Sequence, residues 1–269
     1  MFRFLALLAL IPAAYANDHA IQSMSGWDAF SALQNGNMRF YEGKALHQHQ
    51  DAVRRDELFT GQKPHTIVLS CSDSRVGPEV IFDQGLGDLF VIRVAGNVVG
   101  AEAIASVEYA IEHLGARLLL VMGHESCGAV KAAISSKPGV SNGSESLDVL
   151  VEHIRGHLTS LSLTSAATDS SLRQPVKENV SATLKEILRK SDIVTEAVRK
   201  KGLVLAQGVY SLKTGRVEFW DVGVKNQIVS AVGSAIDAPK IQEQSVHEEI
   251  IPDQVPPPAK KLKLKATAP

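Results

Sequence analysis

The stretch TIVLSCSDSR, residues 66–75, joins a short apolar run to a polar turn that begins with a cysteine. Further apolar runs follow at 88–95 and 118–122, and the segment 101–114 between them has helical spacing. Short β-branched or leucine-rich runs are typical of strands buried on both faces of a parallel sheet. The strand–helix–strand order therefore predicts an α/β protein with a central, mainly parallel sheet flanked by helices.

The rest of the chain is expected to supply the flanking helices and one hairpin. Before the first strand, Trp27–Tyr41 and Asp51–Thr60 have the periodicity of short helices. Later segments complete the pattern: helix over Lys131–Ser171 with a Ser/Gly-rich loop at Lys137–Ser146, helices at Val176–Arg189 and Asp192–Lys200, and a hairpin formed by Leu203–Tyr210 and Arg216–Val222.

Composition restricts the class of partner. The chain has 269 residues, 45% of them hydrophobic and 21% charged, with a net charge of −1. This balance is ordinary for a globular protein and does not favour nucleic acid as a partner. Aromatic residues make up only 5% of the chain, which also argues against a base-stacking surface.

The first residues have the pattern of a secretory signal. Arg3 precedes the apolar run Phe4–Ala13, and Ala14-Tyr15-Ala16 has the form of a cleavage site. The run is too short to span a bilayer, so we expect no stable membrane span; an uncleaved buried or interfacial helix is the alternative. Residues 1–16 therefore predict an exported protein, either periplasmic or secreted.

The mature chain is expected to have three parts. Residues 17–60 form an N-terminal helical arm, and residues 61–235 form the catalytic α/β domain. Residues 236–269 contain Pro-Pro-Pro and a lysine-rich run, a composition typical of a disordered tail.

The chemistry concentrates in two short motifs. Cys71 follows the first apolar run, and His124 and Cys127 follow the third. Cys71 and Cys127 are the only cysteines in the chain. Ligands gather beyond the carboxyl ends of parallel strands, so the two motifs can meet in one crevice. Two thiolates and one imidazole give zinc three protein ligands and leave a fourth position for water, whose pKa zinc lowers toward neutrality. In an oxidising compartment, a Cys71–Cys127 disulfide is the alternative.

Asp73 and Arg75 lie close to the first cysteine. Asp73 is near enough in sequence to Cys71 to coordinate zinc or to accept a hydrogen bond from zinc-bound water. A guanidinium can hold a carboxylate through two parallel hydrogen bonds, so Arg75 could draw Asp73 away from the metal. A purely local ion pair between Asp73 and Arg75 is the alternative.

The pair Cys-Ser-Asp-Ser-Arg and His-x-x-Cys-Gly resembles the β-class carbonic anhydrases. The similarity covers roughly residues 27 to 222. It includes further short motifs: Gly36-Asn37-x-Arg39-Phe40, Gly61-Gln62-x-Pro64, Glu108-Tyr109-Ala110, Gly208-x-Tyr210 and Thr214-Gly215.

The resemblance implies a role for each site residue. Cys71, His124 and Cys127 would hold one Zn²⁺ per chain, with Asp73 as a fourth ligand in a closed state. Asp73 and Arg75 would form the catalytic dyad. Five further positions would line a small, mostly apolar substrate pocket: Gln62, Phe90, Ala95, Tyr109 and Gly128. Val68 stands where some bacterial members have a tryptophan, so the resemblance does not imply their inhibitory bicarbonate site.

The implied activity is reversible hydration of carbon dioxide to bicarbonate and a proton by zinc-bound hydroxide. A hydrolase of carbon disulfide or carbonyl sulfide on the same scaffold is one alternative. A non-enzymatic exported protein with a structural zinc or a disulfide is another. The resemblance also implies a homodimer or larger homo-oligomer whose N-terminal helices pack on a partner subunit; packing of Trp27–Tyr41 on its own domain is equally open.

Overall fold

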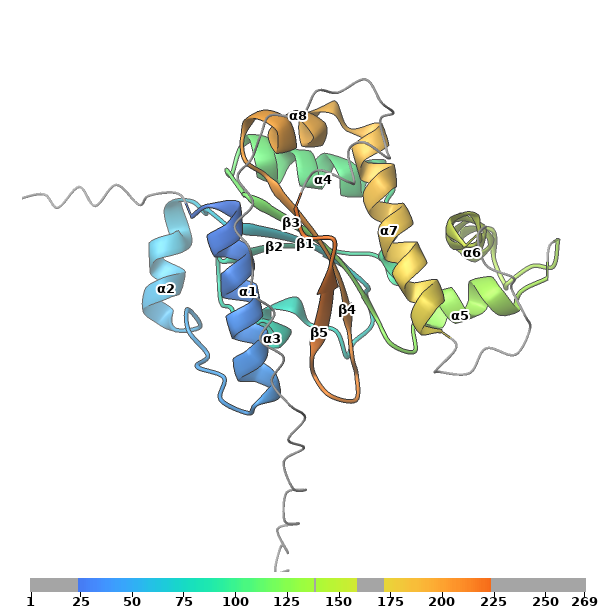
Figure 1. Cartoon of the computed structure of the whole chain (residues 1–269), viewed down its shortest axis with the longest axis horizontal. Coiled ribbons are helices and arrows are strands. Elements are labelled where there is room, and N and C mark those ends of the chain that lie inside the picture. Colours follow the sequence, from blue (N-terminus) through green and yellow to red (C-terminus); the bar gives the residue numbers. More distant parts are fainter. Residues whose placement is uncertain (1–23, 138, 159–171, 224–269) are drawn as a thin grey trace, which may run out of the picture. The chain divides into compact units, whose positions relative to one another are not determined.

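A mainly parallel sheet lies at the centre of the computed structural model, which describes residues 24–137, 139–158 and 172–223 (Figure 1). Within these ranges the sheet has five strands in the order β2-β1-β3-β4-β5. The first four pair in parallel and β5 is antiparallel to β4, which confirms the predicted α/β class and the hairpin. The strands are β1 (Thr66–Ser70), β2 (Leu89–Arg93), β3 (Leu118–His124), β4 (Val204–Tyr210) and β5 (Val217–Trp220).

Helices connect the strands and cover the sheet. The α-helices of the described ranges are α1 (Gly26–Tyr41), α2 (Ala52–Glu57), α3 (Pro78–Ile81), α4 (Ala101–Glu112), α5 (Gly128–Ser135), α6 (Glu145–His157), α7 (Arg173–Lys190) and α8 (Asp192–Lys200). Two 3₁₀ turns, η1 (Leu58–Thr60) and η2 (Ala95–Asn97), complete the elements. Every helix predicted from periodicity is present, although the part of the predicted Lys131–Ser171 helix beyond 158 lies outside the described residues.

Two strands differ from the prediction. Of β2, only Leu89 is buried, because β2 is the edge strand and has β1 as its single neighbour; the expectation of burial on both faces was wrong there. The third strand extends to His124 rather than ending at Met122, because β4 pairs with it along its full length. His124 is therefore part of a strand and not of the following turn.

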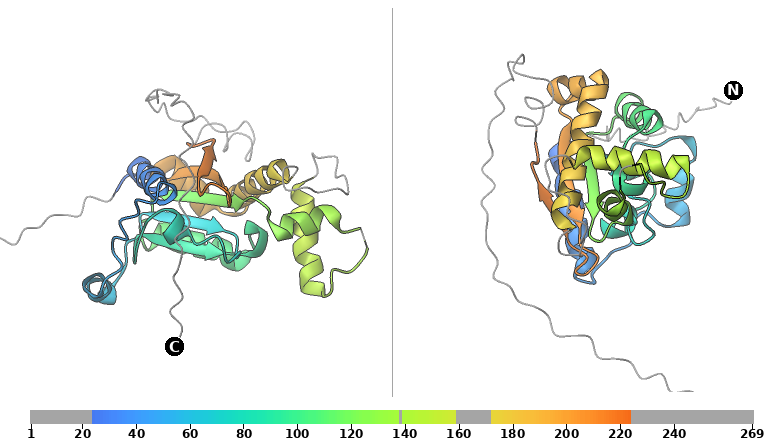
Figure 2. Two further views of the ribbon diagram at one scale, coloured as in Figure 1. Left: turned by 90° about the horizontal axis from the view of Figure 1, so that it is seen from below. Right: turned by 90° about the vertical axis from the view of Figure 1, so that its right-hand side faces the viewer.

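The sheet separates two layers of helices (Figure 2). On one face, Ile67 and Leu69 of β1 pack with buried residues of α4, α7 and α8. On the other face, Val68 packs with residues of α1 and α3. Side chains alternate between the faces of a strand, so each apolar strand supplies both layers. A third cluster joins α5, α6 and α7 to the carboxyl end of the sheet.

Helix α1 packs on the sheet of its own chain. Ala29, Phe30 and Leu33 are buried in the same cluster as Val68 and Leu120. The helix begins with a capping box, in which Ser25 Oγ accepts from the Asp28 amide. The structure therefore shows one face of α1 packed on its own domain, and packing of its other residues on a partner subunit stays a prediction.

The Gly36-Asn37 motif joins α1 to two distant segments. The Asn37 amide donates to the carbonyl oxygens of Ile81 (3.1 Å) and Gly215 (2.9 Å), and its oxygen accepts from the amide of Val217 (2.9 Å). This arrangement needs close backbone approach. An ideal Cβ at Gly36 would lie 1.7 Å from the carbonyl oxygen of Phe82.

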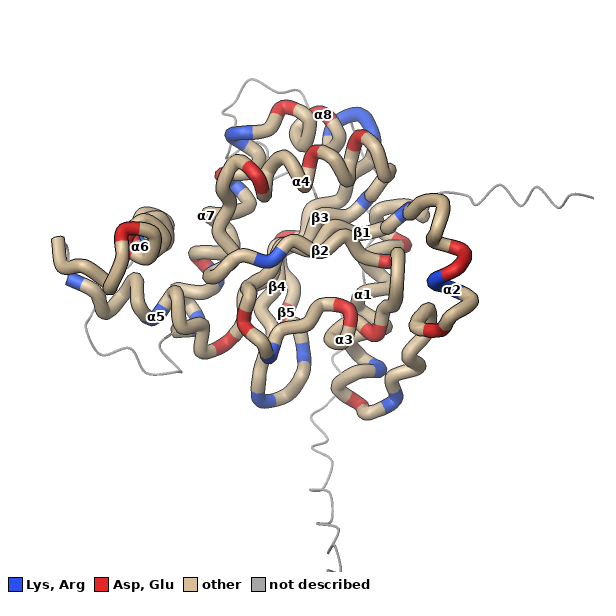
Figure 3. The backbone as a smooth tube through the Cα atoms, turned by 180° about the vertical axis from the view of Figure 1, so that it is seen from behind, with Lys and Arg blue, Asp and Glu red and all other residues tan. Residues whose placement is uncertain are grey.

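Residues 1–23 and 224–269 lie outside the described ranges, so the signal segment and the tail stay predictions. In the parts that are described, no helix combines the length and apolarity required to cross a bilayer. Acidic and basic residues are interspersed over the elements visible in Figure 3.

We predict that Gly36→Ala destabilises the protein by about 3 kcal/mol, because the added methyl group meets a backbone oxygen that cannot rotate away. Urea unfolding monitored by circular dichroism measures this change. Gly156→Ala is the matched control, since a Cβ at this exposed position of α6 meets nothing within 4 Å. We expect Gly156→Ala to stabilise the protein by about 0.5–1 kcal/mol through helix propensity. Equal effects of the two variants would contradict this packing.

Candidate metal centre

The pairing of β1 with β3 brings Cys71 and His124 to one edge of the sheet. Ser70, the last residue of β1, pairs with Met122 of β3. Cys71 follows Ser70 directly, and β3 continues for two residues beyond Met122. Neighbouring strands lie about 4.8 Å apart, so Cys71 and His124 emerge together at the carboxyl ends of the strands.

A tight turn returns Cys127 to the same place. Ser126 has a φ of +54°, a left-handed conformation that reverses the chain directly after β3. Cys127 is then the N-cap residue of α5. Cys71, His124 and Cys127 are all buried, with 5%, 0% and 1% of their surface exposed.

The ligand atoms of Cys71, His124 and Cys127 lie within 4.8 Å of one another. Both cysteines are free in the structure, which therefore gives no support to the disulfide alternative. His124 Nδ1 lies 2.8 Å from the carbonyl oxygen of Glu125, which can only accept, so Nδ1 carries the proton. Its buried Nε2 has no hydrogen-bond partner among the described residues. A buried lone pair facing two thiols fits a metal ion such as zinc.

The two thiols influence each other's ionisation. A hydrogen bond from Cys127 lowers the pKa of Cys71, while the neighbouring Cys71 sulfur, together with burial, raises the pKa of Cys127. The first proton is thus easily lost and the second is retained. Full ionisation requires a compensating cation, which a divalent metal supplies.

Asp73 is held by Arg75 at the margin of the cluster. Arg75 donates from Nε to Asp73 Oδ1 (2.9 Å) and from its terminal nitrogen to Oδ2 (2.7 Å). This bidentate pair holds the pKa of Asp73 well below the usual carboxyl range. Asp73 Oδ2 lies 3.8 Å from His124 Nε2, so the carboxylate is within one small movement of the candidate ligands.

Arg93 and Gly96 support the cysteine loop, although the sequence interpretation assigned them no role. The guanidinium of Arg93 donates to the carbonyl oxygens of Cys71 (3.1 Å) and Asp73 (2.6 Å). The Gly96 amide donates to Cys71 Sγ at 3.4 Å. The sequence feature that could have marked Arg93 is its charge, because it ends the otherwise apolar strand β2.

Asn179 of α7 supports this loop in turn. Its side-chain nitrogen donates to the carbonyl oxygen of Gly96 at 2.6 Å, and the residue is fully buried. Gly96 has a φ of +65°, and a Cβ there would lie 2.6 Å from Ile154, so this position favours glycine. No local pattern in the sequence marks Asn179 for this role, because its partner is 83 residues away.

The predicted pocket residues fall into two groups. Ala95 and Gly128 are neighbours of Gly96 and Cys127, and both therefore lie beside the cluster. Phe90 and Tyr109 lie together, with ring centroids 6.3 Å apart, but Phe90 pairs with Ile67 about 10 Å before the end of β1.

Gln62 is exposed and precedes β1, so it lies at the opposite end of that strand from Cys71. Within one chain, the structure does not bring Gln62, Phe90 and Tyr109 to the cluster.

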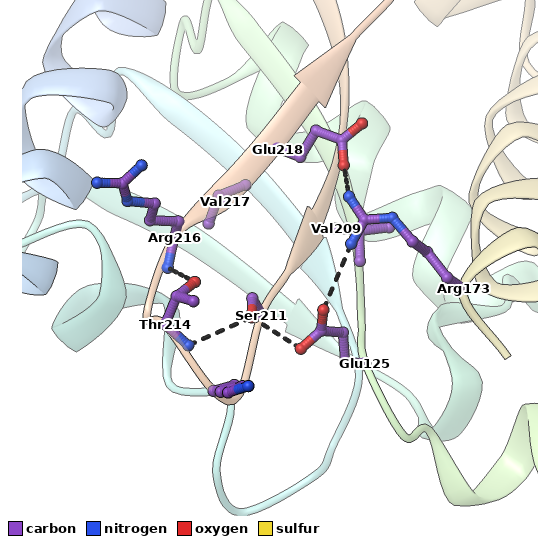
Figure 4. Close-up of a pocket in the computed structure, with 9 residues that line it drawn as sticks. Glu125, Arg173, Val209, Ser211, Thr214, Arg216, Val217 and Glu218 are labelled. Carbon is purple, nitrogen blue, oxygen red and sulfur yellow. Dashed lines mark hydrogen bonds and ion pairs between the residues drawn. The ribbon is translucent and has the colours of Figure 1, made fainter. Parts of the chain in front are cut away.

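A separate pocket of about 400 Å³ lies between the β4–β5 hairpin and α7 (Figure 4). Arg173 crosses it to pair with both Glu125 and Glu218. Glu125 also accepts from Ser211 Oγ at 2.7 Å. The lining includes none of the Cys71, His124 and Cys127 cluster, and Arg173 neutralises the two carboxylates, so we do not assign it as the substrate site.

The parallel sheet and the buried Cys/His/Cys cluster define an α/β protein with a group of side chains that could hold a metal ion. A family model described as carbonic anhydrase matches residues 66–217. The carbonic anhydrase of Mycolicibacterium smegmatis is 36% identical over 190 residues, which cover 71% of this chain and 91% of that protein. Carbonic anhydrase 2 of Mycobacterium tuberculosis is 37% identical over 194 residues, which cover 72% and 92%.

Solved structures show the same likeness. A Coccomyxa β-carbonic anhydrase in complex with acetazolamide superposes with a TM-score of 0.59 at 26% identity, covering 77% of this chain and 93% of that one. A β-carbonic anhydrase of Aspergillus fumigatus gives a TM-score of 0.58 at 27% identity, covering 75% and 95%. The chain belongs to the carbonic anhydrase family, in its β class.

We predict that Arg75→Gln returns the Asp73 pKa toward about 3.9, because the bidentate ion pair is lost. A carboxyl group with a lowered folded-state pKa stabilises the protein above the unfolded-state pKa. It loses that effect as the pH falls through the folded-state value. The difference in free energy of unfolding between wild type and variant should therefore shrink below about pH 4.

Carbon-13 NMR of the Asp73 carboxyl group, with urea unfolding at each pH, measures both effects. Arg55→Gln is a suitable control, since Arg55 pairs only with the exposed Asp56 among the interactions found in the structure. An Asp73 that titrates identically in wild type and Arg75→Gln would contradict the ion-pair assignment.

Proposed function

We propose that the protein catalyses the reversible hydration of carbon dioxide to bicarbonate and a proton, with one zinc ion held by Cys71, His124 and Cys127. The observation that carries this proposal is the convergence of the two thiols with the unpartnered His124 Nε2. Membership of the β-carbonic anhydrase family supports the same reaction. Zinc bound at this cluster would supply Lewis acidity, lowering the pKa of a water ligand toward neutrality.

Asp73 lies beside the cluster, where its carboxylate can contact a reacting water molecule. Because Arg75 keeps its pKa low, Asp73 is ionised at neutral pH and can accept a hydrogen bond but not donate one. The same ion pair keeps its oxygens from the cluster. We propose that Arg75 controls whether Asp73 orients reacting water or occupies the fourth ligand position.

The apolar residues around the cluster suit an uncharged substrate. Cys71 and Cys127 share a packed cluster with Val98, Val130 and Val209. These side chains exclude water from the inner side of the ligands, and carbon dioxide needs no charged group for binding. The relatives reported above are carbonic anhydrases by name, which supports carbon dioxide over carbon disulfide or carbonyl sulfide.

Two broader expectations remain proposals. We propose that residues 1–16 direct export to a periplasmic or extracellular space, supported by their basic start, apolar run and Ala-Tyr-Ala ending. We also propose a homodimer or larger homo-oligomer. Exposure of Trp27 (50%), Phe59 (90%) and Tyr109 (49%) on the single chain supports this assembly.

A second copy would also explain why the predicted substrate-pocket residues lie in two separate places in one chain. Gln62 lies at the far end of β1 from its own Cys71, so in one chain it cannot face the cluster. We propose that the partner copy contributes Gln62, Phe90 and Tyr109 to the site formed by Cys71, Ala95 and Gly128.

We predict that Cys127→Ser lowers both zinc content and carbon dioxide hydration. Loss of the metal's charge stabilisation should slow turnover about a thousandfold or more. Stopped-flow hydration assays on metal-quantified protein measure this loss. Ser135→Ala, an exposed substitution on the same helix, is expected to keep both zinc and activity. Full hydration activity in zinc-free Cys127→Ser would rule out the proposed centre.

We predict that two inactive variants, Cys71→Ser and Gln62→Ala, complement each other after mixing and subunit exchange. In a mixed dimer with shared sites, one site receives an intact cluster from one copy and an intact Gln62 from the other. Mixing should restore roughly a quarter of the wild-type activity for a two-fold symmetric dimer. Mixtures of Cys71→Ser with Cys127→Ser should stay inactive, because neither copy has an intact cluster. If the first mixture also stays inactive while exchange is complete, the shared pocket is wrong.

A further inference from the structure

A second group of metal-type ligands lies between α6 and α7, apart from the cysteine cluster. His153 and His157 are four residues apart on α6, so their side chains project from one helix face. Glu186 reaches toward them from α7. The ligand atoms of the three side chains lie within 4.8 Å of one another. Figure 1 shows the two helices adjacent in space.

Both imidazoles direct the same nitrogen at one carboxylate oxygen. Nε2 of His153 lies 2.8 Å from Glu186 Oε2, and Nε2 of His157 lies 3.2 Å from the same oxygen. The other oxygen, Oε1, is paired with Lys190 at 2.5 Å. Oε2 is therefore the atom that the two histidines share. The three side chains are only 29%, 11% and 12% exposed, so water replaces these contacts poorly.

The surrounding hydrogen bonds determine which nitrogen of His157 carries the proton. The Asn179 side-chain nitrogen donates to the carbonyl oxygen of Gly96, which fixes the orientation of the amide. Asn179 Oδ1 then faces His157 Nδ1 at 2.8 Å and can only accept. Nδ1 of His157 must be the donor.

This tautomer leaves a conflict at the other nitrogen. In neutral His157, Nε2 bears a lone pair, and that lone pair points at a carboxylate oxygen 3.2 Å away. The other oxygen of this carboxylate is already paired with the Lys190 ammonium, so Oε2 keeps its lone pairs toward the histidines. A lone pair of His157 then faces a lone pair of Glu186, and a proton or a metal ion between the two atoms would remove this conflict.

We propose that His153, His157 and Glu186 form a second metal site, which binds a divalent transition-metal ion of the zinc type. Two imidazole nitrogens and one carboxylate oxygen are ligands that zinc accepts, with a fourth position left for water. The hydrogen bond from His157 Nδ1 to Asn179 is the kind of support that orients a metal-bound imidazole. The site is weaker than the cysteine cluster, because it contains no thiolate and Lys190 competes for the carboxylate.

The test is a cobalt titration at neutral pH of the untagged full chain already carrying one zinc per chain at the cysteine cluster. We expect a second equivalent of Co²⁺ to bind and to give visible d–d absorption. A thiolate-to-cobalt charge-transfer band should be absent, because no sulfur ligand is present at this site. That band distinguishes the second site from exchange into the cysteine cluster.

Substitutions at His157 and Glu186 test whether these residues bind the second equivalent of Co²⁺. His157→Gln and Glu186→Gln should each weaken the Co²⁺ affinity at least about tenfold. Retention of one zinc per chain shows that each variant is folded. His113→Gln, which removes an exposed histidine of another element, should leave the titration unchanged.

Three results would overturn the proposal. The first is the absence of a second equivalent in the wild-type protein, a result that does not depend on how any variant folds. The second is cobalt binding that His157→Gln and Glu186→Gln leave unchanged. The third is a second equivalent with thiolate charge transfer. None of these concerns carbon dioxide hydration, so failure here is distinct from failure of the proposed reaction.

Discussion

The parallel register of β1 against β3 is the constraint on which the candidate centre depends. Pairing of Ser70 with Met122 sets Cys71 level with the end of β3 and beside His124. A shift by one residue would turn every side chain of β1 to the opposite layer, since side chains alternate along a strand. Val68 would leave the α1 side, and Ile67 and Leu69 would leave the α4 and α7 side. The strand register that buries the core residues therefore also places the candidate metal ligands.

Beyond the ligands, a chain of hydrogen bonds extends from the thiol toward α6. The Gly96 amide donates to Cys71 Sγ, and the Gly96 carbonyl oxygen accepts from Asn179. Asn179 in turn accepts from His157, a member of the proposed second metal site. A single buried amide side chain thus lies between the two clusters. Binding at one cluster can influence the other through this side chain, whose orientation both sides determine.

Much of this arrangement was predictable from the sequence because it is encoded locally. Apolar periodicity identified the strands and helices, and strand ends followed by Cys71 and by His124 predicted one shared edge. Long-range support was not predictable: nothing near Asn179 in sequence indicates that it holds Gly96. The edge position of β2 also depends on the complete strand order, which its own residues do not specify. For Gln62, Phe90 and Tyr109 the resemblance implied one pocket, yet their positions in a single chain separate them from Cys71.

We propose that Cys71, His124 and Cys127 hold one zinc ion and leave a fourth position accessible to water. X-ray absorption at the zinc edge, on protein carrying one zinc per chain, tests this most directly. We expect two sulfur ligands at about 2.3 Å, with one imidazole nitrogen and one further light atom at about 2.0–2.1 Å. A zinc environment without sulfur, or protein that binds no zinc and contains a Cys71–Cys127 disulfide, would contradict it.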